Sequence, residues 1–154
     1  MKILMSACFS FLLIVQINAQ NTYSILPQPA KLTPAEGQFT FKNNTSIVVT
    51  NGATSFASVA NMLSDQVNAS FGIKLLVKNG STKSNAINFI YNNQLAEEAY
   101  QLKVGTNKID IIAKTGKGAF YALQSLFQCA ILGLPLNANE KYLIYIRPLN
   151  QCSA

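Results

Sequence analysis

The candidate general acids and bases in this sequence are carboxylates, because its 154 residues contain no histidine. They are Glu36, Asp65, Glu97, Glu98, Asp110 and Glu140. Hydrolysis by a carboxylate pair needs the two groups about 5–9 Å apart, on either side of the reacting bond. Adjacent residues of a strand point to opposite faces, so we interpret Glu97 and Glu98 as the solvated start of a strand. Asp65 and Asp110 fall on the polar faces of their elements.

Other kinds of catalytic or binding site are also missing from the sequence. Without histidine there is no histidine-dependent triad and no helix with paired histidine ligands for zinc. Cys129 and Cys152 are too far apart for the close cysteine pairs of a structural zinc site, and the glycines at 116 and 118 lack the other residues of a phosphate-binding loop. We therefore predict no catalytic, cofactor-binding or metal-binding residue in this chain.

The first 19 residues have the pattern of a secretory signal peptide. Lys2 precedes an apolar run that ends near Ile17, and the small residue Ala19 suits cleavage by a signal peptidase. A membrane span needs about 20 apolar residues, and no later segment reaches that length. Cys8 weakly suggests a lipoprotein signal, but most of the apolar run follows it. We expect a secreted or periplasmic protein, cleaved near Ala19.

Composition and charge favour one ordinary domain after the signal. The formal net charge is +6, but only 12% of residues are charged, and the basic residues are scattered without the stripe that nucleic-acid binding requires. Two cysteines remain, and an oxidising compartment would permit a Cys129–Cys152 bridge. Cys129 lies beside the apolar face of a predicted helix, so a packed thiol suits it equally well.

Alternating apolar residues predict a series of short strands. They lie at residues 23–26, 38–41, 46–50, 73–77, 87–91, 100–104 and 109–113. Pro27 and Pro29 stop the first strand and favour an edge position for it, because proline cannot donate to a ladder. The short connection at residues 105–108 predicts that the last two strands form an antiparallel hairpin.

Apolar residues spaced by three and four predict two helices. The first begins near Thr54 and ends at Gly72, a typical left-handed cap. The second runs along the stretch at residues 116–128, and its apolar face continues to Ala130 and Ile131; Gly116 and Gly118 would allow a sharp turn between a strand and the helix. Its polar face carries Tyr121, Gln124, Ser125 and Gln128. This order of elements indicates an α+β fold, a mainly antiparallel sheet with two helices packed on one face.

Three segments, in this order, resemble one known family. They are LPQP at residues 26–29, EAYQLKV at residues 98–104 and GKGAFYALQSLFQ at residues 116–128. Together they resemble the amino-terminal domain of family 20 glycoside hydrolases, the β-N-acetylhexosaminidases. The resemblance implies a non-catalytic, zincin-like domain that precedes and packs against a catalytic (β/α)8 barrel.

In that family the chemistry belongs to the barrel, which would bind N-acetylhexosamine-containing glycans. An adjacent Asp-Glu pair there positions the substrate's acetamido oxygen as nucleophile and protonates the leaving oxygen. The resemblance therefore assigns no catalytic residue to this chain, and Glu97 and Glu98 are not that pair. We expect the chain to be inactive alone and to need no cofactor.

The end of the sequence departs from the family pattern. We divide the chain into a signal peptide at residues 1–19, the amino-terminal domain at residues 20–135 and a divergent tail at residues 136–154. Residues 141–146 could form the strand that leads into the barrel, but residues 150–154 do not continue it. We interpret this tail as a premature end, through a frameshift, a truncation or an incomplete gene model.

Two alternative functions fit the same sequence. The chain could be a free-standing secreted module whose exposed tyrosine and asparagine side chains bind glycans or a partner protein. It could also be the equivalent domain of another hexosaminidase family or of an α-glucuronidase. N-glycosylation patterns occur at Asn43, Asn44, Asn68 and Asn79, and they matter only in an organism that glycosylates.

Overall fold

The computed structural model describes residues 25–26, 28–35, 38–42, 44–50, 54–81, 84–132, 144–146 and 149–153. The strands are β1 (Lys31–Pro34), β2 (Phe39–Thr40), β3 (Ser46–Val49), β4 (Leu76–Asn79), β5 (Ala86–Tyr91), β6 (Tyr100–Val104), β7 (Lys108–Ala113), β8 (Ala130–Leu132), β9 (Ile144–Ile146) and β10 (Leu149–Ser153). The helices are η1 (Thr54–Phe56), α1 (Ala57–Phe71) and α2 (Gly116–Cys129). In these ranges we find no helix with the length and apolar character to span a membrane.

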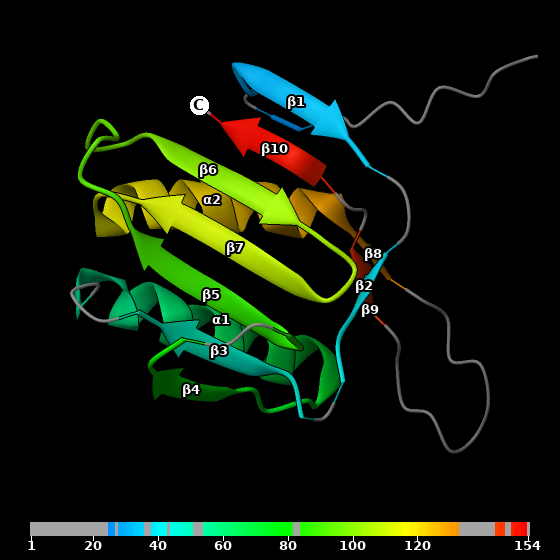
Figure 1. The fold of residues 1–154 in the computed structure, drawn as a ribbon. Coiled ribbons are helices and arrows are strands. Elements are labelled where there is room, and N and C mark those ends of the chain that lie inside the picture. Colours follow the sequence, from blue (N-terminus) through cyan, green and yellow to red (C-terminus); the bar gives the residue numbers. More distant parts are fainter. Residues whose placement is uncertain are drawn as a thin grey trace, which may run out of the picture.

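A seven-stranded sheet with the order β1-β10-β6-β7-β5-β3-β4 forms the body of the molecule. Both α-helices lie on one face of it (Figure 1), which confirms the predicted α+β fold. The sheet is more evenly mixed than predicted, since β5 pairs in parallel with β3 and β7, and β4 in parallel with β3. The reason is that β4 and β5 each begin at the end of the sheet where β3 began, opposite Ser46.

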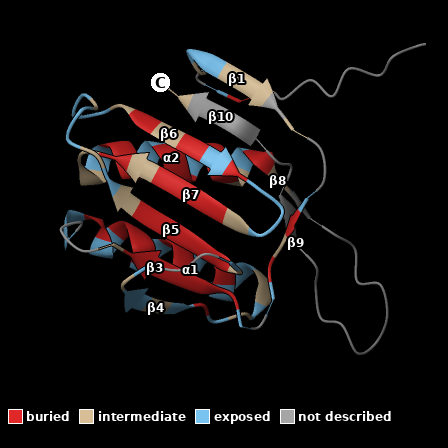
Figure 2. Cartoon of the chain, viewed as in Figure 1, coloured by how far each residue is buried: buried red, intermediate tan, exposed pale blue. Residues whose placement is uncertain are grey.

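The core lies between the sheet and the helices. Alternate residues of β3, β5, β6 and β7 belong to this core, as the period-2 patterns predict. Figure 2 shows that buried residues gather along these strands. Phe56 of η1 and Phe89 of β5 are fully buried, with ring centroids 6.3 Å apart. The hairpin predicted at residues 105–108 is confirmed, because β6 and β7 pair antiparallel from Tyr100 and Ala113 to Val104 and Ile109.

Helix α1 lies where it was predicted and ends at the predicted cap. Its buried side chains include Val59, Leu63 and Val67, the three- and four-residue spacing of an amphipathic helix. It ends at Gly72, whose φ of +67° is the left-handed conformation that a residue without Cβ adopts at little cost.

The first predicted strand is wrong in position. Of residues 23–26 the structure describes Ile25 and Leu26, and neither belongs to a strand; β1 begins at Lys31 instead. Ile25 is buried in the core, and the backbone of Leu26 pairs with the Gln128 side chain of α2, so these two contacts hold the segment in place of a ladder. The edge position predicted for that strand falls with it, and the strand that does end the sheet is β1. Likewise β4 begins at Leu76, three residues later than predicted.

Part of the predicted tail belongs to the two sheets. Strand β9 pairs antiparallel with β2 and β8 in a three-stranded sheet. Strand β10 lies between β1 and β6 in the large sheet, antiparallel to both. The domain boundary at residue 135 remains a prediction, while the backbone of residues 149–153 pairs with strands on the amino-terminal side of that boundary.

Candidate functional site beside helix α2

Helix α2 begins at a closely packed junction with the loop that precedes β6. Thr115 caps the helix by accepting from Gly118 N at 3.4 Å, and its hydroxyl donates to the carbonyl oxygen of Glu97. A Cβ on Gly118 would lie 2.5 Å from Ala99 O, and one on Gly116 3.0 Å from Ser55 O. Both glycines therefore lie inside the first helical turn, where they permit close packing. The chain does turn between Ala113 and Gly116, but the prediction that the two glycines make this turn is wrong.

A groove with a volume of about 690 Å³ runs along the side of α2. Three segments form it: the amino-terminal segment before β1, the loop before β6, and α2 itself. Its lining residues are Leu26, Gln28, Ala96, Glu98, Ala99, Tyr100, Phe120, Tyr121, Gln124, Ser125 and Gln128. Two of them are large apolar side chains that remain exposed, Leu26 at 73% and Tyr121 at 43%. The groove is therefore a mainly apolar surface open to solvent.

A buried hydroxyl pair forms part of the groove lining. Tyr100 of β6 and Ser125 of α2 are buried, and their hydroxyl oxygens are 2.6 Å apart. The prediction that Ser125 lies on the polar face of the helix is wrong, because it stacks with Ala122 and Cys129 on the buried side. A buried serine hydroxyl needs a partner, and Tyr100 supplies one.

The amino-terminal segment is held against α2 by one side chain. The Gln128 amide accepts from Leu26 N at 2.7 Å and donates to Leu26 O at 2.8 Å. A primary amide thus takes the place that a neighbouring strand would have, satisfying the donor and the acceptor of one residue. This contact closes one side of the groove, and it joins two residues that are 102 positions apart in the sequence.

The polar groups of the groove can bind a ligand or partner but form no acid–base pair. Glu98 and Lys117 form a long, exposed ion pair of 3.5 Å at the groove rim, which contributes little to stability. Gln28 and Gln124 present exposed amides, which donate and accept hydrogen bonds but do not titrate. The groove is therefore a candidate interaction surface.

The predicted carboxylates do not converge in the described residues. Asp65 is exposed on α1, and Glu97 and Glu98 are exposed in the turn before β6, in agreement with the solvated positions predicted for them. Glu36 and Glu140 lie outside the described residues. In the described ranges no three histidine, cysteine or carboxylate residues group as metal ligands would.

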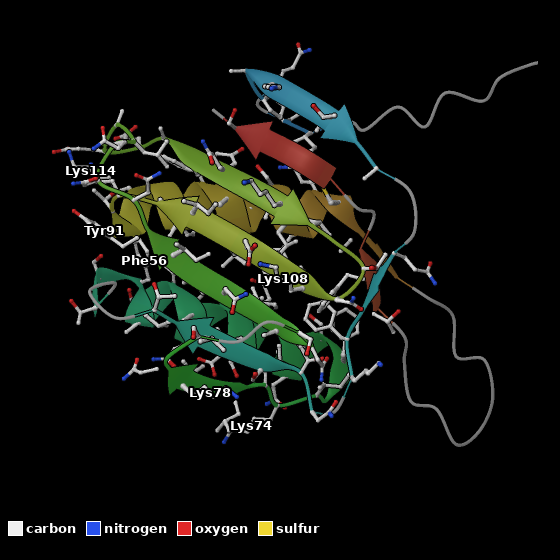
Figure 3. The ribbon with its side chains drawn as sticks, viewed as in Figure 1. Phe56, Lys74, Lys78, Tyr91, Lys108 and Lys114 are labelled. Carbon is white, nitrogen blue, oxygen red and sulfur yellow. The ribbon has the colours of Figure 1, made fainter. Side chains whose placement is uncertain are left out.

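Asp110 differs from the prediction because it is buried, although it does lie on the face of the sheet away from the helices. Its carboxylate accepts from Asn88 Nδ2 at 2.8 Å and from Lys108 Nζ at 2.6 Å. Lys108 lies on the sheet face turned to the viewer in Figure 3. Asn88 Oδ1 is buried and has no hydrogen-bond partner in the described structure. A buried carboxylate needs partners of this kind to offset desolvation.

Sequence reasoning found α2 but missed the groove, because three segments distant in sequence form it. The LPQP segment and the EAYQLKV segment, singled out for their resemblance, supply its other two sides. Cys129 is buried on α2, while for Cys152 the structure describes only the backbone, in β10. Their pairing therefore remains a prediction.

A family model and a related sequence agree on one family. The model of glycosyl hydrolase family 20, domain 2, matches residues 22–131. A β-hexosaminidase of Porphyromonas gingivalis (strain ATCC BAA-308 / W83) is 33% identical over 108 residues, covering 68% of this chain and 14% of that protein. This chain thus spans about one seventh of that relative.

Solved structures show the same fold. An exo-β-N-acetylglucosaminidase of family 20 from Vibrio harveyi, in complex with N-acetylglucosamine, superposes with a TM-score of 0.65 at 23% identity, covering 83% of this chain and 18% of that one. A chitobiase from Flavobacterium johnsoniae has a TM-score of 0.57 at 26% identity, and the match covers 84% of this chain and 20% of that one. In each case the similar region is a small part of a much longer enzyme.

Proposed function

This chain belongs to glycosyl hydrolase family 20 through its domain 2, and on that premise we propose that it is the accessory domain of a secreted β-N-acetylhexosaminidase. Its role is to precede and pack against a catalytic (β/α)8 barrel that hydrolyses terminal N-acetylhexosamine residues. The match over residues 22–131 carries this proposal. The scattered carboxylates support the part that assigns the chemistry to the barrel.

The groove beside α2 supports a packing role. Leu26 and Tyr121 leave apolar surface in water, and an exposed apolar patch with a polar rim is typical of a protein interface. The family match ends at residue 131, just after the helix that forms the groove. A domain that follows residue 131 would therefore start close to this surface.

The DNA downstream of codon 154 tests the proposal directly. We expect one of its three reading frames to encode a (β/α)8 barrel with an adjacent Asp-Glu pair. If no frame encodes a barrel, the accessory-domain role is wrong for this chain.

An activity assay tests where the chemistry lies. Purified mature chain should release no more chromophore from a chromogenic N-acetylglucosaminide than a blank does, because the described carboxylates do not form a pair. Turnover at a normal enzymatic rate would contradict the assignment of the chemistry to the barrel.

Secretion is the second part of the proposal, and its support is the sequence of residues 1–19. Expression of the whole chain in a bacterial host should yield periplasmic protein that begins at Gln20, as read by amino-terminal sequencing. A cytoplasmic product that retains Met1 would contradict it.

Glycan binding by the groove is a second candidate function. The specific observation is an exposed tyrosine ring beside the amides of Gln28 and Gln124, since an aromatic face and amide groups suit the apolar face and the hydroxyls of a sugar. Titration with chitobiose should then shift the NMR signals of Tyr121, Gln28 and Gln124, and Tyr121→Ala should abolish the shifts of the two glutamines. No shift at millimolar sugar would remove this candidate.

A further inference from the structure

Strand β10 connects two parts of the large sheet. It pairs with β6 on one side and with β1 on the other. In the described structure β1 pairs with no strand except β10. The backbone groups on the free side of β6, from Gln101 to Val104, therefore form a site that accepts an antiparallel strand, and residues 149–153 fill it.

The ladder between β10 and β6 is irregular. Leu149 pairs with Val104 and Cys152 with Leu102, so two residues of β10 oppose one residue, Lys103. Such a two-against-one arrangement is a β-bulge, in which the local ladder is disrupted. The pairing of β10 with β1 also shifts, between Thr33 and Pro34. By contrast, β6 and β7 pair without interruption over five residue pairs.

The two α-helices pack mainly on strands other than β10. Helix α2 packs on β6 and β7, and α1 packs on β3 and β4, so β10 and β1 extend beyond the helix layer (Figure 1). The sequence of β10, LNQCS, contains asparagine, a residue depleted in strands, and no β-branched or aromatic residue. The accepting strand β6 is thus packed by α2 and paired with β7, whereas its occupant is a weak strand former.

The connection before β10 is short. Strand β9 belongs to the three-stranded sheet and ends at Ile146, and β10 begins in the other sheet at Leu149. Two residues, Arg147 and Pro148, separate the two strands in the sequence. A short connection invites the exchange of an element between copies, because it leaves little chain with which to turn back into the same sheet. The exchange itself costs little, since the exchanged element makes the same contacts in the partner.

We propose that β10 exchanges between two copies of this chain, so that residues 149–153 of one copy pair with β6 and β1 of the other. The strand-accepting site on β6 is then a self-association surface, independent of the groove beside α2. Each copy donates one strand and accepts one, and the hydrogen bonds of the monomer are reproduced across the interface. Within one chain, β10 is present near its own β6 at an effective concentration on the order of millimolar. The β10 of a second copy competes with it equally only when the protein itself approaches that concentration, and there the exchanged dimer should become populated.

Cysteine cross-linking distinguishes exchange from pairing within one chain. Mature protein with Cys129→Ser and Cys152→Ser receives Gln101→Cys and Ser153→Cys, two positions that are direct partners between β6 and β10. Oxidation followed by non-reducing electrophoresis should give covalent dimer, at a fraction that rises several-fold between about 10 µM and 1 mM protein. The control pair, Gln101→Cys with Ile112→Cys, joins β6 to β7 and should give monomer throughout.

A longer connection provides the second measurement. Insertion of Gly-Ser-Gly-Ser between Pro148 and Leu149 lets β10 reach its own β6 more easily and should reduce the dimer fraction about 5-fold. Cross-linking within single chains alone at about 1 mM would overturn the proposal. A dimer fraction that the insertion does not change would overturn it too, and so would an equal dimer fraction in the control pair. In either case the association would use another surface.

Discussion

The two ends of the large sheet are built differently. Strands β4, β3, β5, β7 and β6 lie under the helix layer and pair without register shifts. All of them except β4, the mostly exposed edge strand, bury the side chains that face the helices. Strands β1 and β10 extend beyond the helices, and both of their ladders shift register. We refer to these regions as the covered sheet and the β1–β10 extension.

The difference shows what fixes register in this molecule. A strand that buries alternate side chains against a helix cannot slip by one residue, because the slip would move its apolar set to the other face. In β1, the one described apolar side chain near the core is the half-buried Leu32. Backbone pairing alone specifies register weakly, so the extension accommodates a bulge that the covered sheet does not contain.

Truncation of a buried side chain should separate the two regions most clearly. Phe89→Ala, in the covered sheet, should lower the free energy of unfolding by about 3–5 kcal/mol because it leaves a cavity. Leu32→Ala, in the extension, should cost roughly 1 kcal/mol because its side chain is already partly solvated. Urea denaturation of both variants measures the contrast, and equal losses would mean that the regions do not differ in packing.

A new charge in the covered sheet should have the next largest effect. Asn88→Asp puts a second carboxylate beside Asp110, which now accepts from the Asn88 amide at 2.8 Å, and should cost about 3 kcal/mol at neutral pH. Asn107→Asp, an exposed change of the same size, should stay within about 0.5 kcal/mol. Thermal unfolding compares the two variants. If Asn88→Asp left the stability unchanged, the Asn88–Asp110 cluster would be accessible to water.

A methyl group at the start of α2 tests the close packing there. Gly118→Ala places Cβ 2.5 Å from the carbonyl oxygen of Ala99, and the backbone shift should cost about 2 kcal/mol. In Gly105→Ala the nearest atom, Lys108 O, is 3.4 Å away, an ordinary contact that should change stability by less than about 0.5 kcal/mol. If Gly118→Ala raised stability, as alanine in an unobstructed helix does, the junction would be looser than described.

Loss of the Gln128 side chain should have the smallest effect. Gln128→Ala removes the two hydrogen bonds to Leu26 and should cost about 1 kcal/mol, with faster hydrogen exchange at the Leu26 amide. Gln124→Ala, one turn earlier on the same helix, should leave that amide unchanged. An unchanged Leu26 amide in Gln128→Ala would mean that the segment is held by Ile25 alone.

The sequence predicted the covered sheet better than the extension for a physical reason. In the covered sheet each element meets its partner through a periodic apolar face, as in Val59, Leu63 and Val67, or Ile109 and Ile111. Periodicity is a local property, so it can be read without knowing the partner. Strand direction is not local, which explains why the parallel pairs of β3, β4 and β5 were not foreseen.

The groove and the extension depend on contacts between distant residues. Ser125 appears polar in the sequence, and only its contact with Tyr100 makes its burial favourable. The glycines of α2 suggested a turn, whereas their role is to admit the carbonyl oxygens of Ser55 and Ala99. The polar β10 has no strand signal of its own, and its pairing follows from the open side of β6.

Native-state hydrogen exchange tests the contrast between the two regions most directly. Amides of β5 and β7 should exchange through global unfolding, whereas the bonded amides of β1 and β10 should open at a free energy lower by roughly 2 kcal/mol or more. If the amides of β10 exchanged with the same free energy as those of β5 and β7, the extension would be an integral part of the cooperative core, and the distinction drawn here would be wrong.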